Sequence, residues 1–337
     1  MSAPLWSVAL ATHNGARHLE AQLDSIATQR LLPSELVVYD DASTDGTPSI
    51  LATFASTAPF TVRVERGGTP LGPTRAFDRA LALCQGTFVA LADQDDVWYP
   101  NKLERLTSAF DAAPRLQLVI HDLAYVDAAL RPIGQSKLAR MRRFADPERE
   151  YVTGMASAVR GPFLASCLPV PEVRGIVHDG WLHWCAEDLA AKAIVREVLA
   201  SYRRHDTNAT GAAPLNAARR VGRMHFLRHY LGAALRGELP EVDTLLAQEQ
   251  ERLAWLERTA AAHVHAERCD DDRVRRRLAL RRDAVRAAHE RVRTVRWPRW
   301  SRPWRIASRA LRGDYRHLKG LRGATLDLLT PRRVAPR

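Results

Sequence analysis

Short apolar runs alternate with helical patterns through the first 125 residues of the chain. Each apolar run that predicts a strand ends at polar turn residues, and the segments between runs carry apolar residues at helical spacings of three and four. The predicted strands are residues 5–11, 36–39, 61–64, 88–92 and 116–120. The predicted helices are residues 19–26, 47–54, 74–84 and 101–113. This alternation predicts an α/β fold, a mostly parallel sheet flanked by helices on both faces.

Polar and anionic side chains follow three of the predicted strands. Asn14 follows the first strand, while residues 40–41 (Asp-Asp) and 93–96 (Asp-Gln-Asp-Asp) end two others. Ligands of open α/β sheets bind beyond the carboxyl ends of the strands. We therefore expect these side chains to converge on one rim of the sheet and to form a binding site there.

Each acidic turn has two interpretations. The carboxylates in residues 93–96 repel one another unless a cation offsets them, and such oxygen ligands suit Mg²⁺ or Mn²⁺, which retain open positions for phosphate oxygens. The same residues also suit a solvated turn that caps the following helix. In residues 40–47, an Asp can accept hydrogen bonds from a base or a ribose hydroxyl, or the segment can simply turn the chain. Spacing alone leaves both interpretations open for residues 93–96. In residues 40–47 we expect both roles, with Asp40 or Asp41 binding and residues 44–47 turning the chain.

Beyond about residue 211 the pattern changes to long, Arg-rich helices. Residues 217–234 and 242–295 are helical in pattern, with a break expected near residues 269–272. Three tryptophans then stand among Arg and Pro, and a short amphipathic stretch covers residues 318–329. We expect three parts: an α/β domain over residues 1–215, a helical region over residues 216–295, and a basic, Trp/Arg-rich amphipathic segment over residues 296–337.

The net charge of +12 arises entirely in the last part of the chain. Residues 273–337 carry 21 Lys and Arg against 4 Asp and Glu, whereas the rest carries 29 against 34. With Trp297, Trp300 and Trp304, this composition favours contact with an anionic membrane surface. A solvated basic end and nucleic-acid binding are the alternatives. No zinc module or helix-turn-helix pattern is evident, so we expect no nucleic-acid partner.

Cysteine usage and hydropathy favour a location in the cytoplasm. The 4 cysteines are scattered without metal-ligand spacing, which is typical of reduced thiols in the cytoplasm. No basic segment leads into an apolar run at the N-terminus, and no window offers about 18 consecutive apolar residues. We expect a cytoplasmic protein, peripheral at the inner face of the cell membrane. A dinucleotide cofactor is disfavoured, since neither G-x-G-x-x-G nor G-x-x-x-x-G-K-[ST] follows the first strand.

Five segments, in order, resemble family 2 glycosyltransferases, especially rhamnosyltransferase-like members. They are Ala-Thr-His-Asn-Gly (11–15) with Gln22 to Gln29, Asp-Asp-Ala-Ser-Thr-Asp-Gly-Thr (40–47), Ala-Asp-Gln-Asp-Asp-Val-Trp (92–98) with Pro100, Lys102 and Leu103, His-Asp-Gly-Trp (178–181), and Tyr-Arg-Arg-His (202–205) with Asn208 and Gly211. The chain departs from the family in three places: His13 replaces Tyr, Arg204 replaces Gln and Asp206 replaces Gly.

The resemblance implies a GT-A type nucleotide-diphospho-sugar transferase fold and a divalent cation, Mg²⁺ or Mn²⁺. Asp95 would bind the metal together with Asp93, and Asp179 would be the general base. His178 and Trp181 would form the acceptor-side wall. The donor would contact Thr12, Asn14, Asp40, Asp41, Arg75, Asp93, Arg203 and His205. The residues themselves leave simpler roles open: a helix cap for Asp179, and solvent-facing positions for Arg75 and residues 202–205.

The resemblance also implies a reaction. The chain would be an inverting glycosyltransferase that moves L-rhamnose from dTDP-L-rhamnose to a saccharide or lipid-linked acceptor in cell-surface polysaccharide synthesis. A nucleotidyltransferase also uses paired Asp and a metal beside a parallel sheet. It usually needs a Gly-rich basic loop after the first strand, which residues 13–17 match poorly. Release of a nucleoside diphosphate, and not of pyrophosphate, would distinguish the two.

Overall fold

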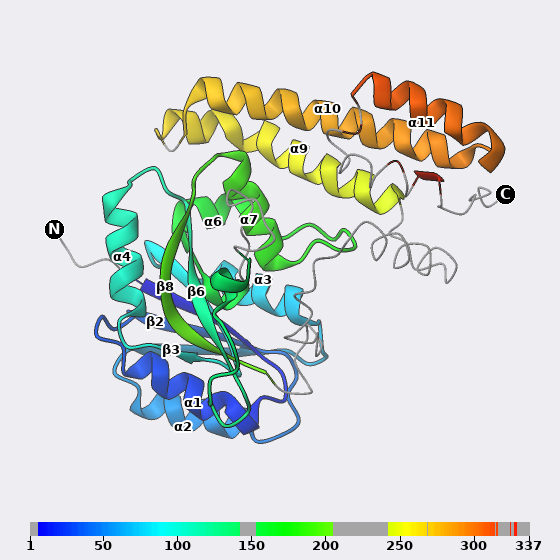
Figure 1. Ribbon diagram of the computed structural model, residues 1–337. Helices are drawn as coiled ribbons and strands as arrows, with labels where there is room; N and C mark the ends of the chain where they lie inside the picture. Colours follow the sequence, from blue (N-terminus) through cyan, green and yellow to red (C-terminus); the bar gives the residue numbers. More distant parts are fainter. Residues whose placement is uncertain are drawn as a thin grey trace. The chain divides into compact units, whose positions relative to one another are not determined.

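Two compact units make up the chain, and each is described by itself. The computed structural model describes residues 6–141, 153–204, 242–267 and 269–313, with Tyr315, Ala324, Asp327 and Leu328 (Figure 1). The first unit consists of Met1–Val170, Val177–Ala218 and Glu267–Cys269. The second consists of Pro171–Ile176, Arg219–Ala266 and Asp270–Arg337.

A mixed sheet forms the centre of the first unit. Its strands are β1 (Trp6–Thr12), β2 (Glu35–Asp40), β3 (Thr61–Arg66), β4 (Phe88–Asp93), β5 (Val97–Trp98), β6 (Leu118–Val126), β7 (Ser157–Arg160) and β8 (Lys192–Arg203). They lie in the order β3-β2-β1-β4-β7-β6-β8-β5. The pairs β2–β3, β1–β2, β1–β4 and β6–β8 are parallel, while β7 runs antiparallel to β4 and β6, and β5 runs antiparallel to β8.

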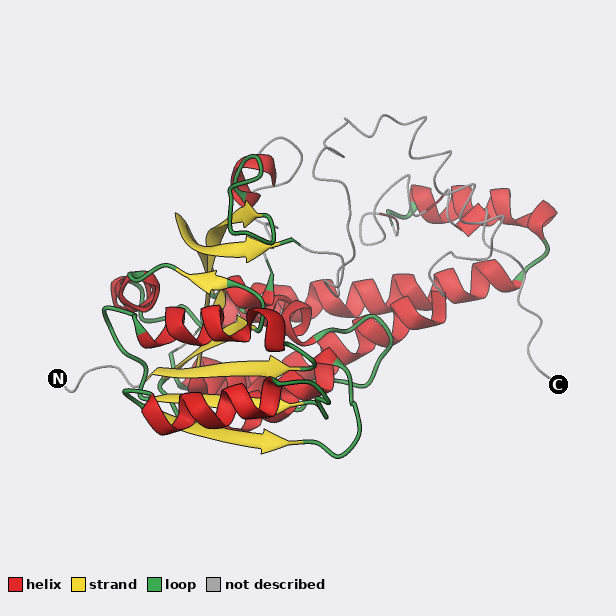
Figure 2. Cartoon of the chain, turned by 90° about the horizontal axis from the view of Figure 1, so that it is seen from below, coloured by secondary structure: helices red, strands yellow, loops and turns green. Residues whose placement is uncertain are grey.

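Helices cover both faces of this sheet (Figure 2). They are α1 (Ala16–Ala27), α2 (Thr47–Thr57), α3 (Pro73–Leu83), α4 (Lys102–Ala112), α5 (Lys137–Met141), α6 (Gly161–Cys167) and α7 (His178–Asp188), with the 3-10 turn η2 (Gly154–Ala156). Strands β1, β2 and β4 are buried almost throughout, because a strand covered on both faces must be apolar on both. The predicted α/β fold class is confirmed.

The register of the central strands sets the position of the site. Thr12 lies opposite Asp40 across β1 and β2, and Ala11 lies opposite Asp93 across β1 and β4. All three strands are parallel, so their carboxyl ends meet at one edge of the sheet. The polar residues that follow β1, β2 and β4 therefore share one rim.

The second unit is helical. It contains α9 (Val242–His265), α10 (Asp271–Arg296), the 3-10 turn η3 (Arg299–Ser301) and α11 (Arg302–Leu311). Ion pairs Arg281–Glu249 (3.0 Å) and Arg282–Glu257 (2.9 Å) join α9 to α10. The break predicted near residues 269–272 is present, and the Asp270 side chain caps α10 by accepting from the Arg273 N–H at 2.9 Å. The helical pattern at residues 217–234 falls outside the described residues.

None of the helices in the described ranges is both long enough and apolar enough to cross a bilayer.

Candidate active site

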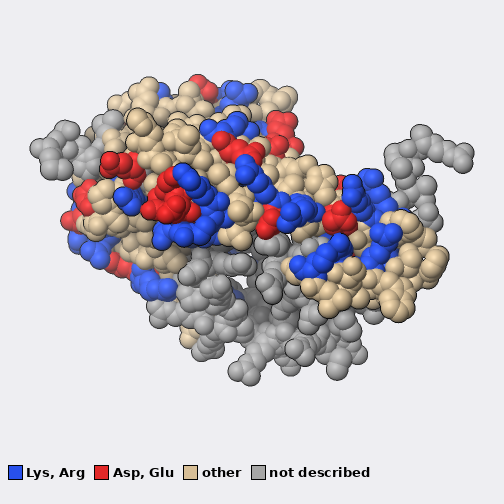
Figure 3. All heavy atoms as spheres, turned by 90° about the horizontal axis from the view of Figure 1, so that it is seen from above, with Lys and Arg blue, Asp and Glu red and all other residues tan. Residues whose placement is uncertain are grey.

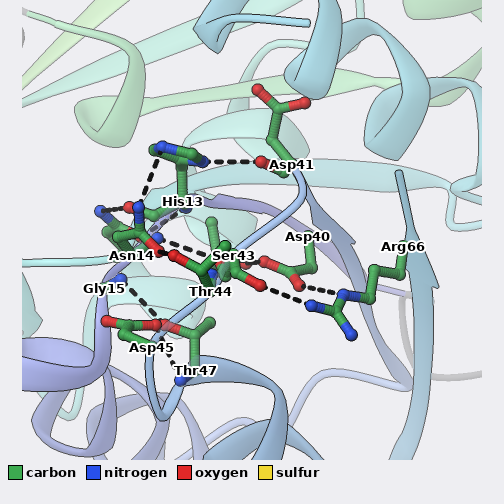
Figure 4. A network of polar contacts seen from close by, with 12 residues as sticks. His13, Asn14, Gly15, Asp40, Asp41, Ser43, Thr44, Asp45, Thr47 and Arg66 are labelled. Atoms are coloured by element: carbon green, nitrogen blue, oxygen red, sulfur yellow. Dashed lines mark hydrogen bonds and ion pairs between the residues drawn. The ribbon is translucent and has the colours of Figure 1, made fainter. Parts of the chain in front are cut away.

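The loops after β1 and β2 are bound tightly to each other (Figure 4). The Asn14 N–H donates to Ser43 Oγ at 2.9 Å, and the Thr44 N–H donates to Asn14 Oδ1 at 2.8 Å. Asn14 has a φ of 47°, in the left-handed region that Asn tolerates better than most residues. The Asn14 amide thus fixes the shape of the rim, where the sequence predicted a contact with the donor.

The same neighbouring loop accepts hydrogen bonds from the backbone N–H groups at the beginning of α1. The Gly15 N–H donates to Thr47 Oγ1 at 2.9 Å, and the Ala16 N–H donates to Asp45 Oδ2 at 3.1 Å. Burial acts to raise the pKa of Asp45, but hydrogen bonds from Thr47 and Ala16 outweigh it and hold the pKa below its usual value. Asp45 is therefore a carboxylate that supports the turn.

Asp40 is fully buried at the end of β2. Thr12 Oγ1 donates to Asp40 Oδ1 at 3.1 Å, and Ser43 Oγ donates to the same oxygen. Arg66 Nε lies 3.2 Å from Asp40 Oδ2 (Figure 4). Both carboxylate oxygens thus face side chains of this protein, which gives Asp40 and Thr12 a positioning role in the rim.

Asp41 connects the end of β2 to the segment before α3. Its two carboxylate oxygens accept from the Leu71 N–H at 2.7 Å and the Gly72 N–H at 2.8 Å. Its carbonyl oxygen lies 2.6 Å from His13 Nδ1, and the His13 side chain is exposed at the rim. Asp41 therefore holds in place both the exposed imidazole and the loop that leads into α3.

Gln94, which the sequence analysis did not single out, joins the acidic loop to the first loop. Its side chain accepts from the His13 N–H at 2.9 Å and donates to the His13 carbonyl at 3.1 Å. A Cβ on Gly15 would lie 2.2 Å from Gln94 Oε1, so this approach requires glycine at position 15. The clamp fixes the acidic loop, residues 93–96, against the end of β1.

Arg203, at the end of β8, holds the other side of the acidic loop. Its N–H donates to Asp96 Oδ1 at 2.9 Å, and its Nε donates to the Asp95 carbonyl at 2.8 Å. Its Nη1 donates to the Ala128 carbonyl at 2.8 Å, and the residue is buried. The sequence analysis predicted that Arg203 contacts the donor diphosphate. In the structure its guanidinium donates hydrogen bonds to two backbone carbonyls. His205, the other basic residue predicted there, is outside the described residues.

Lys102 places a buried ammonium group beneath the acidic loop. Its Nζ donates to the Met155 carbonyl at 2.7 Å and lies 3.6 Å from the centroid of the Trp98 ring. Burial holds the pKa of Lys102 well below its usual value, while the charges of Asp96 and Asp93 act in the opposite direction. Sequence analysis gave Lys102 no role because, at the start of a helix, it looks like a surface residue.

The acidic loop concentrates more negative charge than its surroundings accommodate. Burial raises the pKa of Asp93 to about 8, and the charges of Asp95 and Asp179 add to this shift while Lys102 opposes it. Burial also raises the pKa of Asp96 well above its usual value. Asp96 Oδ2 is buried without a hydrogen-bond partner in the described structure.

These observations fit a divalent cation bound partly by the substrate. The raised carboxyl pKa values of Asp93 and Asp96 arise from burial and then from mutual repulsion, and a cation would offset both. Within the described ranges, no cluster of three or more His, Cys, Asp and Glu side chains could enclose a metal ion. Mg²⁺ commonly takes only one or two protein carboxylates and fills its other positions with water and phosphate oxygens. Asp95 and Asp93 fit that pattern.

Asp179 lies in the first turn of α7 and is largely buried. Its Oδ1 accepts from the Gly180 N–H at 2.7 Å. A Cβ on Gly154 would lie 3.4 Å from Asp179 Oδ2 and 3.2 Å from His178 Nε2, so the backbone of η2 closes one side of both groups. Because Asp179 contributes to the raised pKa of Asp93, the acceptor-side and metal-side carboxylates lie within electrostatic reach of each other.

The two aromatic residues predicted for the acceptor wall have different environments. His178 stacks on Phe77, with ring centroids 4.0 Å apart and planes at 16°. Burial lowers the pKa of His178, which favours the neutral imidazole. Trp181 is only 1% exposed, and its Nε1 donates to the Cys167 carbonyl at 2.8 Å. The expectation that Trp181 presents a flat face to a sugar is therefore corrected: its ring is part of the core.

The remaining candidates serve local structure. Arg75 Nη1 donates to the Val170 carbonyl at 2.9 Å and lies 3.3 Å from Asp78 Oδ2, which anchors the segment after α6. Of the carboxylates near Asp179 in sequence, Glu187 pairs with Lys192 at 2.6 Å and Asp188 is 1% exposed. Asp179 therefore remains the best placed base in the described part of this segment.

Comparisons with known proteins agree with this architecture. Residues 7–158 match the family model described as glycosyl transferase family 2. An uncharacterised glycosyltransferase of Nostoc sp. is 29% identical over 218 residues, which cover 60% of this chain and 65% of that protein. The succinoglycan biosynthesis protein ExoO of Rhizobium meliloti is 28% identical over 141 residues, 41% of this chain and 39% of ExoO. The chain thus spans less than two thirds of both curated relatives.

A solved structure shares the fold. The structure of S. aureus TarS 1-349 in complex with UDP-GlcNAc has a TM-score of 0.53 and 18% sequence identity, and the match covers 82% of this chain and 91% of TarS 1-349. At that identity the likeness concerns the fold alone. The solved structure shows the GT-A fold, and residues 7–158, which carry the acidic rim at the ends of β1, β2 and β4, match family 2 glycosyltransferases.

Proposed function

We propose that this chain is an inverting glycosyltransferase that moves a sugar from a nucleoside diphosphate donor to a hydroxyl group of a saccharide or lipid-linked acceptor. One observation carries the proposal: Asp179 comes from a segment far in sequence from Asp93 and Asp95, yet beside burial both Asp95 and Asp179 raise the pKa of Asp93. A metal-side pair and a base on the acceptor side are the groups that a single displacement at a sugar carbon needs.

The side chains have distinct tasks in this proposal. Asp179 takes the proton from the attacking hydroxyl. Arg203 holds the acidic loop from β8, and the charge of the buried Lys102 acts on Asp93 and Asp96, so that the loop is in position before the donor arrives. His13 is exposed at the rim with its Nδ1 beside the Asp41 carbonyl, and its imidazole ring would stack on the nucleobase of the donor.

A divalent cation, Mg²⁺ or Mn²⁺, completes the site at Asp95 and Asp93. When bound, it supplies positive charge for the departing diphosphate without a proton transfer. The buried, unpartnered Asp96 Oδ2 and the raised pKa of Asp93 support a cation at this place.

The donor and the pathway are proposed from the relatives and the sequence motifs. TarS was solved with UDP-GlcNAc, so the shared fold accommodates a nucleotide sugar. ExoO is a succinoglycan biosynthesis protein, which supports a role in the synthesis of a surface polysaccharide. L-rhamnose from dTDP-L-rhamnose is the first donor to test, since the acidic segment of residues 92–103 resembles the rhamnosyltransferase-like version.

A thermal-shift panel tests the donor and the cation together. The protein is heated with dTDP-L-rhamnose, UDP-GlcNAc and GDP-mannose, each with and without Mg²⁺ or Mn²⁺. A donor that binds only the folded state raises the melting temperature, by an amount that grows with its concentration. We expect a shift that needs both donor and cation. The selected donor is then offered with acceptors; release of pyrophosphate in place of a nucleoside diphosphate would contradict glycosyl transfer and favour a nucleotidyltransferase.

A further inference from the structure

Helix α11 buries arginines and exposes apolar side chains, which is the reverse of the pattern of an ordinary surface helix. Two of its three arginines, Arg302 and Arg309, are 0% and 2% exposed, whereas Trp304 and Leu311 are 82% and 90% exposed. Surface helices normally bury their apolar stripe and expose their charges. The reversal means that the second unit stabilises the arginines internally and leaves the apolar side chains without a partner in the described structure.

A buried carboxylate explains the inward arginines. Both oxygens of Asp327, which is 0% exposed, are used: Arg291 Nε donates to Oδ1, and Arg309 Nη1 lies 3.2 Å from Oδ2. The Tyr315 hydroxyl donates to the same Oδ2 at 2.8 Å. Charge-assisted bonds of this kind are among the stronger interactions in a protein. They fix which face of α11 points inward.

Backbone carbonyls hold the second arginine. Arg302 donates to the carbonyl oxygens of Val295 at 2.5 Å, Trp297 at 3.0 Å and Asp327 at 3.2 Å. Every one of these acceptors belongs to the second unit. The orientation of α11 is therefore set by its own unit.

The outward face of α11 is mainly apolar, with the exposed Ser308 beside Trp304 and Leu311. Arg302, Ile306 and Arg309 recur at spacings of four and three, so they form one stripe that points inward. Trp304 and Leu311 are seven residues apart and lie on the opposite side of the helix, with Ala307 between them. Trp300, in η3 just before the helix, is also 82% exposed. We name Trp300, Trp304, Ala307 and Leu311 the α11 apolar face.

Exposed arginines border the α11 apolar face. Arg305 and Arg312, one residue after Trp304 and Leu311, lie on one flank and are both exposed. Arg305 lies 3.8 Å from the centroid of the Trp297 ring, which supports its guanidinium beside the face. Arg296, at the end of α10, is exposed as well. In Figure 3, basic side chains border an area of other residues on the part of the surface that α10 and α11 form, at the right of the view.

We propose that the α11 apolar face is where this protein inserts into the headgroup layer of an anionic lipid bilayer. Tryptophan favours the membrane interface, and arginines beside an inserted apolar face reach anionic headgroups. The positive border selects such a lipid over a neutral one. The proposal assigns the contact to Trp304 and Leu311 and excludes Arg291, Arg302 and Arg309, which Asp327 and backbone carbonyls engage. It does not depend on which sugar the catalytic domain transfers.

Vesicle co-sedimentation of the full chain tests the proposal. The probes are vesicles of phosphatidylcholine, with and without phosphatidylglycerol. We expect the protein to bind the anionic vesicles, with an affinity that falls as salt is added. The affinity should fall about tenfold or more when Trp304→Ser is combined with Leu311→Ser, because two apolar side chains are then no longer transferred out of water. Leu32→Ser, in the other unit and 42% exposed, is the matched control and should bind like the wild type.

A gain-of-binding variant separates the proposal from misfolding. Ala307→Leu adds apolar surface to the same face, and we expect it to bind anionic vesicles several-fold more tightly. Unchanged binding by both the double variant and Ala307→Leu would overturn the proposal, as would a wild type that does not bind anionic vesicles. Light scattering measures the oligomeric state. If the wild type is a dimer, and the double variant is a monomer with unchanged vesicle binding, the α11 apolar face is an interface between copies of the chain and the membrane assignment is overturned.

Discussion

Single side chains at the rim of the sheet divide into those that face the reaction and those that hold others in place. Asp95, Asp93 and Asp179 belong to the first group, since their charges act on one another. Asp40 and Arg203 belong to the second, since backbone groups and side chains of the chain engage them. A motif residue is thus not always a ligand residue, and substitutions should separate the two groups.

The base is tested by Asp179→Asn, which keeps the size of the side chain and removes its basicity. We expect kcat to fall by about two to four powers of ten, the usual span for the loss of a general base. The donor-induced rise in melting temperature should remain, because donor binding does not need the base. The product should have the anomeric configuration opposite to that of the donor.

Glu187→Gln is the control for the base, since Glu187 pairs with Lys192 at 2.6 Å. We expect it to lower kcat much less than Asp179→Asn does. If Glu187→Gln stops transfer while Asp179→Asn proceeds at the normal rate, the assignment of the base is wrong.

Gly154 should matter through its neighbours. An added Cβ would lie 3.2 Å from His178 Nε2 and 3.3 Å from Asp179 Cβ, closer than side chains usually approach. Gly154→Ala should displace the base by a few tenths of an ångström and lower kcat roughly tenfold, because catalysis depends steeply on such placement. Gly68→Ala is the matched control, since nothing lies within 4 Å of its Cβ. Equal rates for the two variants would show that Gly154 does not position Asp179.

At the scale of elements, the acidic loop contains carboxylates that repel one another and is held by hydrogen bonds from two sides. Gln94 joins it to the end of β1, Arg203 joins it to the end of β8, and the charge of the buried Lys102 in α4 acts on Asp93 and Asp96. This arrangement keeps the carboxylates together although they repel one another. A cation is the natural counterpart of such a loop, and its binding should depend on pH.

Cation binding should strengthen as the pH rises through about 8. The pKa of Asp93 is raised to about 8, so below that pH its carboxyl group is mostly protonated and a cation must displace the proton. The donor-dependent thermal shift should therefore need less Mn²⁺ or Mg²⁺ at pH 8.5 than at pH 6.5. Asp95→Asn should abolish most of that shift at either pH, and Asp111→Asn, an exposed residue of α4, should leave it intact. A cation requirement that is the same at both pH values would contradict the raised pKa.

The sequence identified those elements that are local apolar patterns. Strands β1, β2 and β4 are each a short buried run with a polar end, so their positions and the shared rim were predictable. Strand β7, with 4 residues, and β5, with 2, are too short to give a pattern. The antiparallel pairing of β7 between β4 and β6 was therefore missed.

The partners of buried charges were missed for a different reason. Lys102 donates to a carbonyl 53 residues away, and Arg203 donates to one 108 residues away. No local pattern encodes such distances. For the same reason Trp181 looked like a wall of the site, although its indole N–H is satisfied by Cys167 inside the core.

At the scale of the whole molecule, the basic end of the chain is in large part a folded helical unit. The charge excess and the tryptophans are visible in the sequence, but the sequence could not show that Arg291, Arg302 and Arg309 are buried. Asp327 neutralises charge at the centre of this unit. The unit should therefore depend on one carboxylate more than on any of its surface ion pairs.

Asp327→Asn tests this dependence. The substitution removes the charge of Asp327 from the buried Arg291 and Arg309, and breaking a buried ion pair typically costs about 3–5 kcal/mol of the free energy of unfolding. Asp271→Asn breaks the exposed Asp271–Arg275 pair and should cost about 0–1 kcal/mol. Urea unfolding followed by circular dichroism measures both. Similar midpoints for the two variants would show that the buried cluster does not stabilise the unit.

The position of Asp327 along the chain also gives the helical unit an order of assembly during translation. Arg291, Arg302 and Arg309 are synthesised before the carboxylate that neutralises Arg291 and Arg309. Until Asp327 has left the ribosome, Arg291 and Arg309 lack this carboxylate, so we expect the inward packing of α11 to be completed only after Asp327 has been made. The catalytic domain, whose rim is complete by Arg203, precedes this step in synthesis. The face that we assign to the membrane is thus created last, after the residues of the enzyme's acidic rim have been made.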